Sequence, residues 1–123
     1  MVKTETIKFW CDIVNKKMGW KVDWKYYDSF KNSIILKEFS YGYVACLPLI
    51  EHTGIKSLYV LSWWIDPSMF TPPAFFQIQD EIKKIAKKEK CNYIRQYSDY
   101  NPKLNRLLIK RYGYKVSELK VEV

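Results

Sequence analysis

Apolar residues recur along this chain in two periods, one typical of helices and one typical of strands. Between residues 5 and 18 they return every three or four positions, which predicts an amphipathic helix ending at Gly19. The same period predicts two further helices, over residues 72–89 and 101–112. Residues 20–32 follow neither period clearly, and we expect at most a short helix there.

Five other segments have the alternation and the β-branched and aromatic content of strands. The first two read as a hairpin, and the predicted strands cover residues 33–39, 43–50, 55–65, 91–98 and 114–123. No linker, repeat or low-complexity stretch divides the chain. The order of elements predicts one α/β domain over residues 1–123, with a mixed central sheet flanked by helices.

The chain is basic, and this favours anionic partners. Among 123 residues, 21 Lys and Arg outweigh 13 Asp and Glu, which gives a net charge of +8. Nucleic acid, phosphorylated cofactors and acidic protein surfaces all fit such a charge, although a Lys excess also serves solubility. Basic and aromatic residues alternate in KRYGYK and DWKYYDSFK as in some single-strand binders, but no nucleic-acid motif accompanies them, so nucleic acid remains an open alternative.

Cysteine and histidine are too few and too scattered for several kinds of site. Cys11, Cys46 and Cys91 form no CxxC pair, and His52 lies in the turn-like EHTG, so we predict no metal site, no disulfide framework and no catalytic histidine. No apolar run resembles a signal peptide or reaches the length of a membrane span. We therefore expect a reducing, cytoplasmic compartment and no membrane partner.

From about residue 34 to the end, the order of elements and several short words resemble the GNAT superfamily of N-acetyltransferases. SIILKEFSYGYVACLPL resembles that family's second and third strands, SLYVLSWWIDP its fourth strand, residues 72–89 its central helix, and RYGYK its closing Gly-Phe. In that family the fourth and fifth strands separate, and free backbone of the fourth holds the pantetheine arm of acetyl-CoA. The resemblance implies that a cofactor would contact Trp64, Ile65, Thr71, Ala74 and Phe75.

The chain departs from the family pattern in the segment that would bind the diphosphate. The family's loop donates backbone N–H groups at a helix N-terminus, but Pro72 and Pro73 have no N–H and Phe75 adds a ring where a phosphate would approach. A purely structural interpretation also fits this segment: Thr71 caps the helix and the two prolines start it.

The residue expected to act as general acid also differs. Many family members place a Tyr four residues before the Gly of Gly-Phe, and here that position is Ile109. Tyr100 and Tyr112 are out of that register. Asp66 is the titratable group at the exit of the fourth strand, and its place before a proline fits a turn better than a base.

These departures lead to a prediction of a non-catalytic GNAT-like scaffold that binds no cofactor and acts through a protein partner or self-assembly. Such reduced domains resemble small phage virion and ejection-associated proteins, which would make the chain virion-associated. The expected interface residues are Trp63, Trp64, Met69 and Phe70, because adjacent tryptophans on a strand point to opposite faces and one of them needs a cover. The alternative is a divergent N-acetyltransferase that uses acetyl-CoA.

Overall fold

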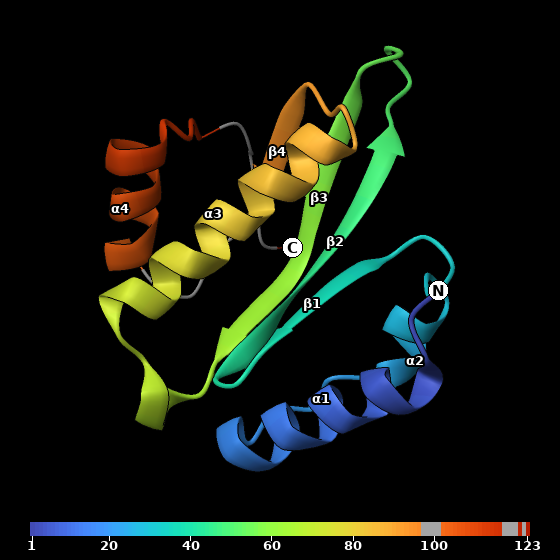
Figure 1. The fold of residues 1–123 in the computed structure, drawn as a ribbon, viewed down its shortest axis with the longest axis vertical. Helices are drawn as coiled ribbons and strands as arrows, with labels where there is room; N and C mark the ends of the chain where they lie inside the picture. Colours follow the sequence, from blue (N-terminus) through green and yellow to red (C-terminus); the bar gives the residue numbers. More distant parts are fainter. Residues whose placement is uncertain (97–101, 117–120, 122) are drawn as a thin grey trace.

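The computed structural model describes residues 1–96, 102–116, 121 and 123. Figure 1 shows its arrangement. The helices are α1 (Thr4–Met18), α2 (Trp24–Asp28), α3 (Pro72–Lys88) and α4 (Pro102–Tyr112), and a short 3₁₀ helix, η1, spans Pro67–Met69. The strands are β1 (Ile35–Phe39), β2 (Gly42–Ile50), β3 (Lys56–Ile65) and β4 (Tyr93–Gln96).

The described helices and strands lie where the sequence periods place them. The segment 20–32 holds the short helix α2. Residues 114–116 are in neither helix nor strand, and half of the strand predicted over 114–123 lies outside the described residues, as do Tyr100, Asn101 and the end of the strand predicted over 91–98.

The sheet is mixed, which confirms the predicted fold class. Its order is β1-β2-β3-β4, with β1 and β3 antiparallel to β2 and with β4 parallel to β3. A parallel pair needs a crossover, and α3 supplies it. In Figure 1, α3 and α4 lie on one side of the sheet and α1 on the other.

The two faces of the sheet bury two separate apolar clusters. On the α3 side, Val44 and Leu58 are fully buried against residues of α3 such as Ile78 and Ile82. On the α1 side, the cluster of Trp10, Val14, Ile34, Tyr43, Ala45 and Trp64 is completed by aromatic and aliphatic residues of α1, α2 and the strands. Strand alternation therefore assigns neighbouring residues of β2 and β3 to different cores.

A β-bulge interrupts that alternation in the middle of β3. Cys46 of β2 lies opposite Val60, but the preceding Ala45 lies opposite Ser62, so Leu61 is an extra residue on β3. Bulges of this kind bend a strand and leave the extra residue outside the ladder. The bulge marks the point where the two halves of β3 begin to differ in their partners.

Candidate functional site

The second half of β3 has a strand partner on one edge only, within the described part of the chain. Towards β2, β3 is paired as far as Ile65. Towards β4, pairing covers only Ser57–Val60, because β4 as described ends at Gln96 opposite Val60. We call the edge of β3 beyond Val60, which has no β4-side partner among the described residues, the β3/β4 notch. A strand edge without a partner presents N–H and C=O groups that can bind an extended ligand.

Four polar side chains from four segments meet at the end of the β3/β4 pairing. The Trp63 indole Nε1–H donates to Oε1 of Gln96 over 2.8 Å. The Gln96 Nε2 group donates to Oε1 of Gln79 over 3.1 Å and to the hydroxyl oxygen of Tyr114 over 3.2 Å. Gln79 Nε2 lies 3.4 Å from the same Gln96 Oε1. The network links β3, β4, α3 and the residue after Gly113.

Tyr114 is the titratable member of this network. Burial raises the pKa of its phenol above the ordinary value of 10, and the hydrogen bond from Gln96 offsets part of that rise. Tyr114 is therefore protonated at neutral pH and carries a proton that it can donate. The network places this hydroxyl next to Gln96, at the end of the described β3/β4 pairing.

The connection from β3 to α3 is held by Asp66. Its carboxylate accepts from the backbone N–H of Ser68 at 3.0 Å and from the Ser68 hydroxyl at 2.8 Å, and it forms an ion pair with Lys17 of α1. The hydrogen bonds from Lys17 and Ser68 lower the pKa of Asp66. This carboxylate stays charged and bound, so it supports the turn instead of acting as a base.

The N-terminus of α3 has its backbone donors absent or in use. Pro72 and Pro73 carry no N–H, the N–H of Ala74 donates to the Thr71 hydroxyl at 3.2 Å, and the N–H of Phe75 donates to the Thr71 carbonyl at 3.1 Å. Thr71 therefore caps the helix as its sequence position predicts. A diphosphate would need other donors here.

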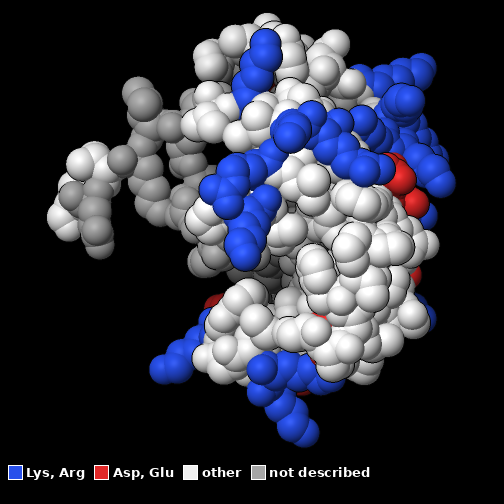
Figure 2. Space-filling model, turned by 90° about the vertical axis from the view of Figure 1, so that its left-hand side faces the viewer, with Lys and Arg blue, Asp and Glu red and all other residues white. Residues whose placement is uncertain are grey.

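Arg111 of α4 supplies a cation beside that helix end. Its guanidinium carbon lies 3.9 Å from the centre of the Phe76 ring, and Phe76 belongs to the first turns of α3. Stacking on an aromatic ring leaves the edge of the guanidinium for anions. Figure 2 shows this face of the molecule, with a band of Lys and Arg across its upper part and a hollow directly below the band.

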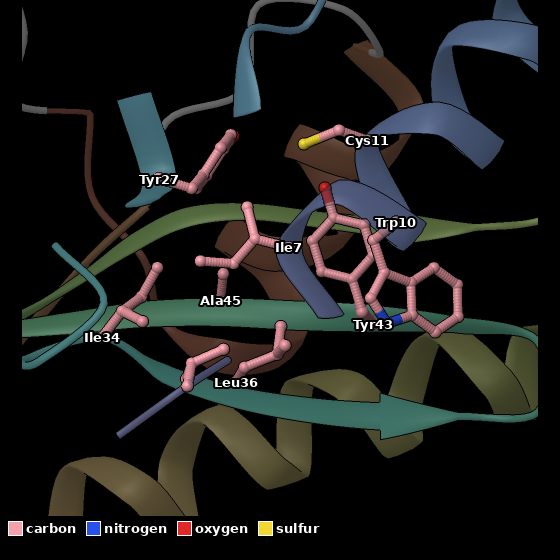
Figure 3. A pocket seen from close by; sticks show the side chains of 9 residues that line it. Ile7, Trp10, Cys11, Tyr27, Ile34, Leu36, Tyr43 and Ala45 are labelled. Atoms are coloured by element: carbon pink, nitrogen blue, oxygen red, sulfur yellow. The ribbon is translucent and has the colours of Figure 1, made fainter. Parts of the chain in front are cut away.

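A separate cavity lies on the α1 side of the sheet. It has a volume of about 20 Å³ and is lined by apolar residues of α1 and of the first two strands (Figure 3). In that view the sulfur of Cys11 and the hydroxyl of Tyr43 are at the same end of it, and the Tyr43 hydroxyl is 3.0 Å from Ser62 Oγ. The volume suits a water-sized group and is far too small for a coenzyme.

The predicted interface residues divide into covered and exposed ones. Trp64 is 6% exposed and packs against Trp10 of α1, and Trp63 packs against Phe75 of α3, so both strand faces are covered by the chain itself. Met69 and Phe70 are 45% and 44% exposed at the exit of β3. An interface role for these residues stays a prediction.

The residues implied as cofactor contacts surround the same region, but most are not accessible. Ile65, Ala74 and Phe75 are buried and Thr71 is exposed. No pattern in the sequence predicts a role at the site for Gln79, Gln96, Tyr114 or Arg111. The one available signal was the Tyr directly after Gly113 in RYGYK.

Among the described residues, no three His, Cys, Asp or Glu side chains are grouped so that they can hold a metal ion. No helix in the described part of the chain is both long enough and apolar enough to cross a bilayer.

Comparison with known proteins identifies the fold. No family model matches the sequence, and no curated protein matches it. Among solved structures, an acetyltransferase of Trypanosoma brucei aligns with a TM-score of 0.73 and 12% identity over 99% of this chain and 94% of that one. A ribosomal-protein-alanine N-acetyltransferase of Brucella melitensis aligns with a TM-score of 0.70 and 11% identity, over 99% and 95% of the two chains.

A predicted acetyltransferase of Clostridium acetobutylicum, solved with acetyl-CoA, aligns with a TM-score of 0.71 and 14% identity, over 99% of this chain and 92% of that one. These neighbours correct the prediction of a non-catalytic, phage-type scaffold, because they are acetyltransferases and fit the alternative hypothesis better. The comparisons and the mixed sheet together show that this chain has the GNAT fold.

Proposed function

We propose that this protein is an N-acyltransferase that transfers an acetyl group from acetyl-CoA to an amine. One observation carries the proposal: the Tyr114 hydroxyl is hydrogen-bonded to Gln96, opposite Val60, where the pairing of β3 with β4 ends within the described residues. An acyl donor with an extended, amide-containing arm needs such an edge, and the departing thiolate needs a proton. The structural neighbours support the same chemistry, since one of them was solved with acetyl-CoA.

Separate groups of the chain fit the two parts of acetyl-CoA, the pantetheine arm and the diphosphate. The backbone of Leu61–Ile65 offers hydrogen-bonding groups for the pantetheine arm. The diphosphate cannot use the N-terminus of α3 as it stands, and Arg111 beside Phe76 is the cation placed to bind it. In this proposal the diphosphate is bound by the side chain of Arg111 instead of by the backbone N–H groups that the family's loop uses.

Tyr114 serves as general acid in this proposal. The amine nitrogen attacks the thioester carbonyl, the C–S bond breaks with its electron pair remaining on sulfur, and the Tyr114 hydroxyl gives its proton to that sulfur. The nitrogen releases one proton to water, and Tyr114 regains a proton from water. The products are an amide and a free thiol, so the balance requires no other reactant.

Acetyl transfer can be tested with purified protein, acetyl-CoA and a panel of primary amines, by following release of the thiol. Tyr114→Phe removes the proton donor and keeps the ring, so kcat should fall by about 10²–10⁴-fold while the KM for acetyl-CoA changes little. Tyr112→Phe is the matched control, because Tyr112 lies two residues away and has no place in the network.

The expected control result is an unchanged kcat. Calorimetry should show binding of acetyl-CoA in all three proteins. Absence of both binding and thiol release at millimolar acetyl-CoA would contradict the proposal.

A further inference from the structure

The amide of Gln96 has only one orientation that its neighbours permit. An indole N–H is a donor and never an acceptor, so the atom facing Trp63 Nε1 at 2.8 Å must be the Gln96 oxygen. Turning the amide over would set two donors against each other. The orientation thus follows from hydrogen-bond chemistry and not from a choice between two similar atoms.

The orientation of Gln96 in turn fixes the direction of the next hydrogen bond. With its oxygen towards Trp63, Gln96 presents Nε2 to Tyr114, and an amide NH₂ can only donate. The Tyr114 oxygen is therefore an acceptor in this bond. Among the described residues, no acceptor is found for the proton of the Tyr114 hydroxyl itself.

Gln79 adds a second constraint on the same amide. It is 1% exposed on the face of α3 that otherwise carries apolar core residues such as Ile78 and Ile82. Its oxygen accepts from Gln96 at 3.1 Å. Burying an amide costs free energy unless its groups are paired, so a polar residue at this core position needs a specific partner. Gln96 is that partner, and the pair resists rotation of either amide.

We propose that Gln96, oriented by Trp63 and Gln79, is a positioning residue that keeps the Tyr114 hydroxyl proton available for donation in the notch. The inference rests on the proposed function, in which Tyr114 protonates the leaving thiolate. Gln96 acts through Tyr114 and needs no contact with substrate. Removing the donor group of Gln96 should therefore shift the pKa of the Tyr114 phenol. If Gln96 only supported packing, its removal would leave that pKa unchanged.

The deciding experiment measures ionisation of Tyr114 without any substrate. Protein labelled with 3-fluorotyrosine, whose phenol ionises at lower pH, is titrated by ¹⁹F NMR, and Tyr114→Phe identifies the signal. Among the described residues, the other titratable groups that face Tyr114 are Cys46 of β2 and Tyr112 of α4, and they are kept in every variant. Gln96→Met should raise the pKa of Tyr114, because the phenolate loses the amide donor that stabilises it.

Two more variants extend the test. Trp63→Phe removes the donor that holds the Gln96 oxygen in place, so the paired amides of Gln96 and Gln79 can turn over together. The Gln96 oxygen can then accept the Tyr114 proton, and the pKa of Tyr114 should again rise. Gln77→Glu is the control: Gln77 already accepts from the Tyr41 hydroxyl at 2.5 Å, so an acceptor-only carboxylate preserves that bond and should leave Tyr114 unchanged.

Kinetics complete the comparison. We expect Gln96→Met to lower kcat about tenfold or more with little change in the KM for acetyl-CoA. An unchanged Tyr114 titration in both folded variants, Gln96→Met and Trp63→Phe, would overturn the positioning role. A shifted titration in a protein that transfers no acetyl group would instead support the hydrogen-bond arrangement and refute the proposed function, so the two failures are distinguishable.

Discussion

At the residue scale, Gly42 shows how closely β2 and β3 approach at the end of their hairpin pairing. A Cβ placed on Gly42 would lie 1.8 Å from the carbonyl oxygen of Trp64, which is backbone and cannot move aside cheaply. Gly42 lies opposite Ile65, on the edge of β3 that faces away from the notch. The close approach fixes the position of the half of β3 that we propose to bind the acyl donor.

We predict that Gly42→Ala destabilises the protein by about 1–3 kcal/mol or more, because β2 and β3 must separate to accept the methyl group. Gly54→Ala is an informative comparison, since Gly54 has open space around it and a φ of +83°, so its cost is conformational and not steric. Urea denaturation of both variants measures the difference. A Gly42→Ala protein as stable as the wild type would contradict this packing.

Ionisation of the Glu51 carboxyl group should make the stability of the fold depend on pH. Hydrogen bonds from Arg95 and Tyr59 lower the pKa of Glu51 from 4.5 to about 2. Because the folded pKa lies below the unfolded one, the ionised carboxylate stabilises the fold above about pH 4.5, and this contribution is lost as the pH falls towards 2. Glu51→Gln should flatten the fall in melting temperature across this window.

The control for Glu51 is Glu89→Gln, since Glu89 makes no ion pair within the described residues. Its melting temperature should follow the wild type through the same acid range. Equal slopes for wild type and Glu51→Gln would show that the cluster with Arg95 does not persist in solution.

At the scale of elements, α3 and α4 depend on residues at the centre of their buried faces. Ile82 is fully buried and Leu108 is 5% exposed, both in the α3-side cluster. Truncation of either to Ala should cost about 2–5 kcal/mol, because it leaves a cavity in a closely packed core. Lys87→Ala, on the solvent side of α3, should cost less than about 0.5 kcal/mol. Chemical denaturation with equal midpoints for all three would contradict these helix faces.

The elements were predictable from the sequence to the extent that their apolar residues are periodic. The helix predicted over 72–89 is observed at Pro72–Lys88, since Thr71 and the two prolines mark its start. α2 was uncertain because five residues are too few to show a period. Periodicity also assigns polar residues to solvent, and Gln79, a polar residue on a core face, is therefore missed by the same rule that finds Ile78 and Ile82.

At the scale of the whole molecule, the candidate site is assembled from segments that are far apart in the sequence. Trp63, Gln79, Gln96 and Tyr114 belong to different elements and meet only because α3 crosses back to place β4 beside β3. The family pattern places the general acid at the position of Ile109. It does not point to Tyr114, because a sequence pattern compares positions along the chain and not positions in space. Only the fold shows that the Tyr114 hydroxyl accepts from Gln96 at the end of the described β3/β4 pairing.

Part of the excess of basic residues behind the net charge of +8 lies on one face of the molecule. α4 carries Lys103, Arg106, Lys110 and Arg111, and the band of cations in Figure 2 lies above the hollow on the face where α4 and the start of α3 meet. An anionic acyl donor would be attracted to this face, and the attraction should weaken as salt screens it. Arg111 is the cation held closest to the capped N-terminus of α3.

We predict that Arg111→Ala raises the KM for acetyl-CoA about tenfold or more, because a charge-assisted hydrogen bond to a phosphate is lost. The KM for acetyl-pantetheine, which has the thioester but no diphosphate, should not change. Arg111→Lys should be intermediate, since a lysine keeps the charge but not the planar, bidentate donor. Lys87→Ala removes the same charge at the far end of α3 and controls for the overall field. If Arg111→Ala affected both donors equally, Arg111 would act on the notch or on α4 packing, and the diphosphate would have to bind elsewhere on this face.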